Sequence, residues 1–475
     1  MDPWLLAATS AVVGFVFVVL LCLGKPLAGP AATIAWGCAV FTAEAGLVGA
    51  GTTSGSTLTL PKLIPLFVLL VACAWLALNS RPSSDYAVSP PLRWAIWYVC
   101  WLVPCALLGP YPLSGLLRVA QIALPLVVVI VVRRAAASGT AGLLGATIVG
   151  CAAHVVYAVF VDADYVGVEG EQRLTGLLIA NTFGLAAAVT LAGAFGVWLG
   201  KASRRGPALL LWTAIAVSGY ALVQAAARTA AIAVLLALVA AISSTWRLGK
   251  TSRGRAAMSG GALVMTVVYV IFQPQIYSSA ASSFIRGNTE LFTLTGRLPL
   301  WGDLLTAVAD NPLFGYGPAA FRNHAPELGR YLTASELGLS VAHNALVEAL
   351  VSGGLIAGLL WLALMVSTAR HVVRVPKSLR PVAVALYMVG AVSAITSSSA
   401  AGIGMGWYLL LALAVLPVMP SPAVQESPVL VRASASLFRR RKSSPGGGLV
   451  PARVPTQGTR YAARRAASTR PAGSR

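Results

Sequence analysis

Charged and polar side chains that lie inside or beside long apolar stretches are the residues of this chain best suited to do chemistry. Apolar residues make up 57% of the 475 residues, and charged residues only 10%. A charge inside a membrane costs free energy, so an ionisable residue kept there usually serves a function. Among the four histidines, His343 stands out, because the segment from Ser340 to Asn344 opens an apolar stretch. A neutral imidazole at such a place can act as a general base.

The local sequence predicts how His343 is held. We expect Ser340 to be the N-cap of a helix and His343 to lie in its first turn. The positive end of a helix dipole disfavours an imidazolium, so His343 is expected to be neutral. Asn344 and Glu348 are four residues apart and share a face beside it. The alternative, that these residues only cap and anchor a helix at the interface, stays open.

Arginines near the ends of other apolar stretches are the second group of interest. Arg173, Arg228 and Arg297 lie at such positions. A guanidinium can bind phosphate oxygens in a bidentate manner. A lone arginine can instead extend to the membrane surface and bind nothing specific. Arg118, one turn inside another apolar stretch, has the same two interpretations.

The apolar stretches that must position these residues are long enough to be transmembrane helices. A helix needs about 20 apolar residues to cross a bilayer. The stretches are 4–23, 29–50, 62–79, 92–109, 114–132, 139–161, 175–199, 207–224, 229–246, 256–273, 344–369, 381–397 and 403–419. We therefore predict an all-α, polytopic membrane protein with about 13 transmembrane helices, within a range of about 12 to 14. Such a composition excludes a soluble enzyme and a secreted mini-protein.

The charges of the loops predict the orientation. Basic residues occupy every second loop, and such loops lie in the cytoplasm. The long segment 274–343 is then extracytoplasmic, and Arg173, Arg228, Arg297 and His343 all fall on that same side. Three arginines and one histidine at one membrane face favour a joint role over separate interfacial anchors.

The long segment contains one predicted helix of its own. The residues 299–308 form an amphipathic pattern. Asn311 and Pro312 end it, and the glycines of 315–318 predict a turn. The residues expected on its apolar stripe are Trp301, Leu304, Leu305 and Val308.

The chain divides into a transmembrane domain, 1–420, and a basic cytoplasmic tail, 421–475. The tail has one acid, Glu426, and is rich in Pro, Gly, Ser and Arg, so we expect it to be disordered and attracted to anionic membrane lipids. Because the net charge of +21 lies in loops and this tail, it does not indicate a nucleic-acid partner. The six cysteines show no metal-ligand spacing, so neither a metal nor a disulfide framework is expected.

Four motifs resemble a known family. Residues 295–297 with Trp301, followed by 311–318, resemble the G-R-x-x-x-W…P-x-x-G-x-G segment of O-antigen ligases and related Wzy-type polymerases. Residues 342–344 with Glu348 and the glycines of 353–355 resemble the H-N…G-L opening of that family's next helix.

Two upstream motifs add to the resemblance. Residues 173–176 with Asn181 are similar to an R-x-T-G…N element, and residues 228–230 are similar to an S-R-T element. Ala227 stands where the serine of that element is expected. The resemblance covers about residues 170–370, and its motifs keep the family's order.

The resemblance implies a glycosyltransferase whose donor is a glycan on a polyprenyl diphosphate. The acceptor would be a hydroxyl of a glycan or glycolipid at the outer face of the bacterial plasma membrane. Arg228 and Arg297 would bind the diphosphate leaving group, and His343 would accept the hydroxyl proton. Residues expected to bind substrate are Arg173, Asn181, Trp301, Asn344 and Glu348. The family is thought to be metal-independent, so no cofactor is expected, since guanidinium groups can supply the positive charge.

A transporter or lipid-linked glycan flippase is the alternative function. Such proteins also combine many helices with intramembrane charges, but they place polar sites near the midplane and often contain inverted repeats. Here the polar groups cluster at one face beside a long outer loop, which favours the enzyme. The sequence leaves open whether the enzyme ligates a finished chain or polymerises repeat units.

Overall fold

The computed structural model describes the part of the chain that contains most of the predicted site. The described residues are 36–37, 40, 88–135, 140–161, 164–166, 172–174, 180–200, 208–225, 227–245, 297–321, 327–332, 342–398, 401–402 and 404–418. All of them belong to one compact unit, Met1–Met419. The predicted helices at 4–23, 62–79 and 256–273, most of 29–50 and the tail 421–475 lie outside the described residues.

The apolar stretches within the described part are helices, as predicted. Each begins and ends within a few residues of its predicted bounds. The helices are α4 (Pro90–Leu108), α5 (Pro112–Ala135), α6 (Thr140–Val161), α7 (Ala180–Gly200), α8 (Ala208–Gln224), α9 (Arg228–Thr245), α15 (Ala345–Val372), α16 (Arg380–Thr396) and α17 (Met405–Ala414). Among the described residues, α4, α5, α6, α7 and α15 are long and apolar enough to cross a membrane, and the others are shorter. The total of about 13 stays a prediction.

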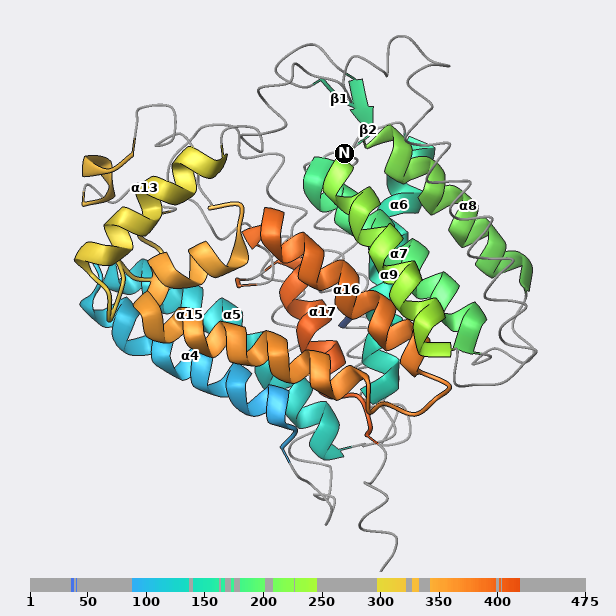
Figure 1. The fold of residues 1–475 in the computed structure, drawn as a ribbon, viewed down its shortest axis with the longest axis horizontal. Coiled ribbons are helices and arrows are strands. Elements are labelled where there is room, and N and C mark those ends of the chain that lie inside the picture. The colour runs from blue at the N-terminus through green and yellow to red at the C-terminus, as the bar shows by residue number, and fades with distance from the viewer. Residues whose placement is uncertain are drawn as a thin grey trace, which may run out of the picture. The chain divides into compact units, whose positions relative to one another are not determined.

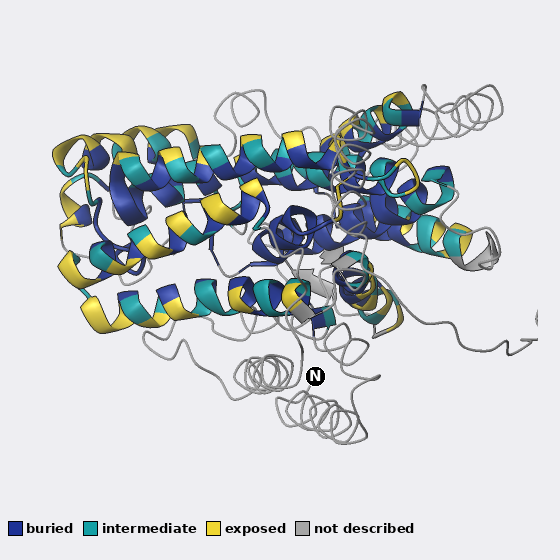
Figure 2. Ribbon diagram, turned by 90° about the horizontal axis from the view of Figure 1, so that it is seen from below, coloured by how far each residue is buried: buried dark blue, intermediate teal, exposed yellow. Residues whose placement is uncertain are grey.

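The helices pack in two neighbouring groups that meet at α16 and α17. In one group α4 packs against α5 and α15, and in the other α16 packs against α7 and α9, as Figure 1 shows. Buried residues lie on the parts of the helices that are turned toward neighbouring helices, and exposed residues lie on the outward parts (Figure 2). Many of the exposed side chains are large and apolar, for example Trp97, Phe160 and Leu359. Such surfaces are typical of helices that face lipid.

Small residues let the helices of the second group approach closely. A Cβ atom added to Gly184 of α7 would lie 2.4 Å from the Cβ of Ala227 and 3.2 Å from that of Ala230. Helix packing in membranes commonly uses such small residues, because they allow the backbones to come near each other. The start of α9 is thereby fixed against α7.

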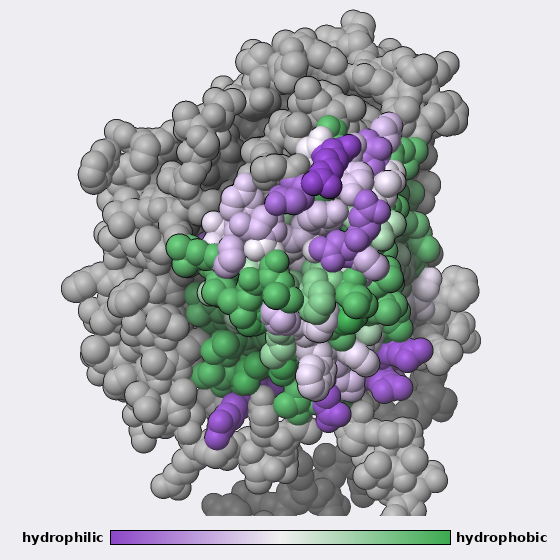
Figure 3. Space-filling model, turned by 90° about the vertical axis from the view of Figure 1, so that its left-hand side faces the viewer, coloured by the Kyte–Doolittle hydropathy of each residue, from purple (hydrophilic) through white to green (hydrophobic). Residues whose placement is uncertain are grey.

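The long segment contains the predicted amphipathic helix, α13 (Arg297–Asp310). The predicted apolar stripe of this helix was partly wrong. Leu305 is 46% exposed, and Leu300, which was not predicted to lie on the stripe, is fully buried. The helix starts two residues earlier than predicted, and its buried residues Leu300, Leu304, Ala307 and Val308 follow the i, i+4, i+7, i+8 spacing of one helix face. These side chains pack against α15, and on the face seen in Figure 3 apolar side chains gather in a band with hydrophilic ones above and below.

Two further short elements complete the described part. The strands β1 (Asp164–Val166) and β2 (Gln172–Leu174) pair antiparallel, with Tyr165 opposite Arg173. A single 3-10 turn, η5 (Leu328–Arg330), follows α13. The prediction of an all-α fold is therefore correct for the described residues apart from this short hairpin.

The turn after α13 is locked into a break in α15. Gly353 and Gly354 leave the helical conformation, and Gly354 has a φ of 68°. A Cβ atom on Gly354 would lie 2.3 Å from the carbonyl oxygen of Leu313, so only glycine fits there. Side chains and the turn itself satisfy the backbone groups that the break frees. The three hydrogen bonds run from Tyr316 N to Val351 O (2.8 Å), from Leu355 N to Pro312 O (2.7 Å) and from Trp101 Nε1 to Gly353 O (2.8 Å).

Candidate functional site

The start of α15 differs from the prediction and places His343 outside the helix. Asn344 is the N-cap, and its Oδ1 accepts hydrogen bonds from the backbone N–H groups of Leu346 (2.9 Å) and Val347 (3.1 Å). The prediction that Ser340 caps the helix and that His343 lies in the first turn was wrong. The physical reason is that asparagine is as good an N-cap as serine. Here its side chain satisfies two free donors at once, so the helix begins at Ala345.

His343 has an unusual backbone conformation. Its φ is 54°, the only positive φ of a non-glycine residue in the described part of the chain. Such a conformation costs about 1–3 kcal/mol and persists only where the surroundings impose it, commonly at functional sites. Both backbone polar groups of the preceding residue, Ala342, are bound. The N–H of Ala342 donates to Oε2 of Glu348 (3.0 Å), and its carbonyl accepts from Nε1 of Trp301 (2.9 Å).

The last turn of α16 brings Arg297 and His343 together. Nη1 of Arg297, the first residue of α13, donates to the carbonyl oxygen of Thr396 (3.2 Å). Nδ2 of Asn344, next to His343, donates to the neighbouring carbonyl of Ile395 (3.2 Å). Carbonyls at the C-terminal end of a helix lack intrahelical partners and carry negative partial charge, so they attract such donors. Two elements distant in sequence thus meet at one helix end.

This arrangement keeps His343 neutral. Burial lowers its pKa, and the positive charge of Arg297 lowers it further, to about 4. The neutral imidazole expected from the sequence is therefore retained, although burial rather than a helix dipole is the main cause. Burial also lowers the pKa of Arg297. Even so, an arginine stays protonated in proteins, so the site pairs a neutral base with a cation.

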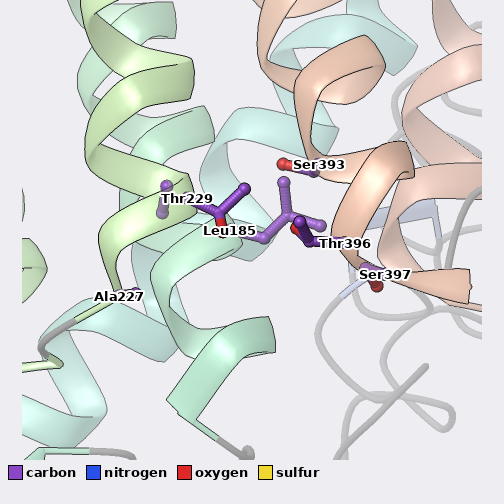
Figure 4. A pocket seen from close by; sticks show the side chains of 7 residues that line it. Leu185, Ala227, Thr229, Ser393, Thr396 and Ser397 are labelled. Atoms are coloured by element: carbon purple, nitrogen blue, oxygen red, sulfur yellow. The ribbon is translucent and has the colours of Figure 1, made fainter. Parts of the chain in front are cut away.

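Thr396 also lines a small pocket. Its space is about 10 Å³, enough for roughly one water-sized group. The pocket lies between α7, the start of α9 and the end of α16, as Figure 4 shows. Its lining residues are Leu185, Ala227, Thr229, Ala230, Ser393, Thr396 and Ser397. Thr396 therefore belongs to both halves of the site, because its carbonyl binds Arg297 and the residue also lines the pocket.

Residues 213–362 match the family model described as O-antigen ligase. The chain carries an O-antigen ligase domain. The comparison with curated proteins gives no match. The matched segment contains Arg228, Arg297 and His343, so the resemblance drawn from the motifs is confirmed. The match and the candidate membrane-spanning helices support a relation to membrane-bound glycan ligases and polymerases of polysaccharide biosynthesis.

Three of the predicted site residues are placed by their main chain only. Arg228, inside the ligase domain, is the first residue of α9 and lies between two residues that line the pocket. Arg173 lies in β2, and Asn181 is the second residue of α7, both upstream of the ligase domain. The structure does not describe their side chains, so their roles in substrate binding stay predictions.

Other residues of the site gave little or no signal in the sequence. The pocket hydroxyls of Ser393, Thr396 and Ser397 lie at the end of an apolar helix, where small polar residues are common. Only the polar run that follows Thr396 marked this end as unusual. Arg118, whose role stayed open, points toward the turn after α16. Its Nη2 lies 3.2 Å from the position that a Cβ atom of Gly402 would occupy.

The described residues contain no group of three or more His, Cys, Asp or Glu side chains that could hold a metal ion. The side chain of Arg297 lies near His343, and its positive charge acts on the imidazole.

Proposed function

We propose that the protein transfers a glycan from a polyprenyl-diphosphate carrier to a hydroxyl of an acceptor glycan or glycolipid at the outer face of the bacterial plasma membrane. One observation carries this proposal. A neutral histidine and a half-buried arginine meet at the last turn of α16, across from the helix start that bears Arg228. A base beside cations is the arrangement that glycosyl transfer from a diphosphate requires.

His343 acts as the general base. An imidazole nitrogen accepts the proton of the acceptor hydroxyl while its oxygen attacks the anomeric carbon of the donor. The new C–O bond forms as the bond to the diphosphate breaks, and the diphosphate leaves with the electron pair. Attack from the face opposite to the leaving group inverts the anomeric centre. The depressed pKa of His343 ensures that it is unprotonated at neutral pH before this step.

Arg297 and the start of α9 bind the diphosphate. A helix start presents free N–H groups and positive partial charge, and it attracts phosphate. Arg228 begins this helix, and the hydroxyls of Thr229 and Ser393 line the same pocket and can donate further hydrogen bonds. Guanidinium groups then supply the positive charge that a metal ion supplies in other enzymes, so the reaction proceeds without a metal. Arg173 and Asn181 contribute to the donor site from β2 and α7.

The charge pattern of the helices supports an extracytoplasmic site. His343 precedes α15, while Arg370 and Arg374 lie at the other end of that helix or just after it. Likewise Arg133 and Arg134 end α5. By the positive-inside rule those ends lie in the cytoplasm. The domain 1–420 then carries the reaction on its outer side, and the tail 421–475 binds anionic lipids on the inner side.

A topology reporter tests the side of the site. A reporter fused after Ala319 is expected to read as extracytoplasmic, and one fused after Lys201 as cytoplasmic. Because a transporter or flippase would move the donor across the membrane instead of consuming it, activity decides between these classes. The full-length protein in proteoliposomes should release polyprenyl diphosphate and elongate the acceptor glycan when both substrates are present.

The product distribution separates ligation from polymerisation. Transfer of one finished chain gives a single product length, whereas polymerisation gives a ladder of repeat units. His343→Ala should abolish either product, while Arg374→Lys at the cytoplasmic end should not change it. Release of no polyprenyl diphosphate by a well-folded wild-type protein, with the donor merely moved to the other leaflet, would overturn the proposal.

A further inference from the structure

The backbone of Ala342, the residue before His343, is held by side chains from two separate helices. Glu348 of α15 accepts the N–H of Ala342 at 3.0 Å, and Trp301 of α13 donates to its carbonyl at 2.9 Å. Ala342 is fully buried, so both backbone groups would lack a partner without these bonds. Asn344 fixes the other side of His343 through its bonds to α15 and to Ile395.

These contacts explain how His343 adopts a left-handed conformation without using its own side chain. The structure shows no hydrogen bond between the imidazole and another described residue. The chain on each side is pinned instead, which sets the direction of the Cα–Cβ bond. The residues that fix the histidine are therefore not the residues that react.

We propose that Glu348 and Trp301 are positioning residues, which hold the Ala342 peptide so that His343 faces the acceptor hydroxyl beside Arg297. This inference rests on the proposed role of His343 as the base. It gives the two residues a different role from the substrate binding expected from the motifs, because their hydrogen-bonding groups are directed at the backbone of Ala342.

The positions of Arg297, Trp301 and Glu348 in their motifs are consistent with this positioning role. Arg297 and Trp301 are one helical turn apart on α13 and therefore share a face. From that face Arg297 reaches Thr396, and Trp301 reaches Ala342. One rigid helix thus sets the position of the cation and of the base together. Glu348 turns back to the N–H two residues before the N-cap, in the manner of a capping box.

Substitutions that keep or remove single hydrogen bonds test this role. Glu348→Ala and Trp301→Phe each remove one bond to the Ala342 peptide, and we expect kcat to fall about 10²-fold, the usual effect of a 1 Å displacement of a catalytic group. The KM for the donor should change little. Glu348→Gln keeps an acceptor oxygen and should restore most of the activity. Matched controls are Asp303→Asn on α13 and the exposed Trp97→Phe on α4.

A double-mutant cycle distinguishes positioning from direct participation. If Glu348 acts only through His343, then Glu348→Ala has no further effect in the His343→Ala background. Independent, multiplying losses would overturn the proposal, as would a raised KM at unchanged kcat or a failure of Glu348→Gln to restore kcat. Thermal unfolding of each variant shows whether a loss of kcat is only a loss of folded protein, which would also overturn it.

The activities of the variants distinguish a failure of the positioning role from a failure of the proposed function. Wild-type activity in His343→Ala would show that His343 is not the general base and would overturn both the proposed mechanism and the positioning role. An inactive His343→Ala together with fully active Glu348→Ala and Trp301→Phe would leave the function intact and overturn only the positioning role.

Discussion

The last turn of α16 is contacted on two flanks, and the two flanks differ in the kind of contact that they make. On one flank, α13 and α15 bind it through long polar side chains, Arg297 and Asn344, which reach its free carbonyls. On the other flank, α7 and α9 approach each other closely at Gly184 and Ala227. Between them and the end of α16 they leave a small pocket lined partly by hydroxyls. The first flank holds Arg297 and Asn344 by hydrogen bonds, whereas the second leaves a space for roughly one water-sized group.

The difference matches the needs of the two halves of a group transfer. A general base must keep its geometry, because small displacements reduce the rate strongly. A leaving group must enter, be bound by several donors and depart, so a diphosphate needs more space than the one water-sized group that this pocket holds, and we expect the helices around the pocket to be only moderately restrained. Substitutions on the first flank should therefore lower kcat, and at Arg297, which also binds the diphosphate, they should raise KM as well. Substitutions on the second flank should mainly raise KM.

The largest expected effect is the loss of the base. His343→Asn should reduce turnover by about 10²- to 10⁴-fold, the usual contribution of a general base, while donor binding is largely kept. Asparagine tolerates a positive φ better than most residues, so this variant removes the imidazole without changing the backbone preference. Single-turnover rates and donor binding should be measured separately. Loss of donor binding in parallel with turnover would place His343 at the diphosphate instead.

The second-largest effect is expected from substitution of the two arginines. Arg297→Lys and Arg228→Lys keep the charge but lose the planar fork, and a charged hydrogen bond is worth about 1.5–3 kcal/mol, or roughly a tenfold to hundredfold loss in kcat/KM. Arg228 on the pocket flank should show this mainly in KM, and Arg297 on the fixed flank in both constants. Steady-state kinetics at equal protein level give the answer. Wild-type constants in both variants would show that they are interfacial anchors.

A smaller effect is expected from the turn that joins α13 to α15. In Gly354→Ala the new Cβ atom would collide with the carbonyl of Leu313 at a backbone position with positive φ. We expect a loss of about 1–3 kcal/mol in stability and a lower kcat, because the base and the cation share this support. Gly302→Ala is the matched control, since a Cβ atom there meets nothing within 4 Å. Equal unfolding temperatures for the two variants would contradict the role of the break.

The sequence predicted those features that depend on local pattern. Apolar length located α4 to α9 and α15 to α17, and the spacing of Arg297, Trp301 and His343 located one flank of the site. The start of α15 was misplaced because Ser340 and Asn344 are equally good caps, and the choice depends on the contact of Asn344 with Ile395. The pocket hydroxyls were missed because their value arises from the packing of three helices that are distant in sequence.

The smallest expected effect is a shift in pH dependence. The acid limb of kcat/KM reports the pKa of the base in the free enzyme, so activity should fall as the pH drops through about 4, where His343 becomes protonated. Arg297→Gln removes a nearby positive charge and should move this limb to higher pH. It should not reach the ordinary value of 6.5, because burial is the larger cause and remains. The measurement is a pH profile of the residual activity in Arg297→Gln, with Arg330→Gln on η5 as a control that should not move the limb. An unchanged limb in Arg297→Gln would show that the cation and the base act separately, and the fixed flank would then be a set of independent anchors.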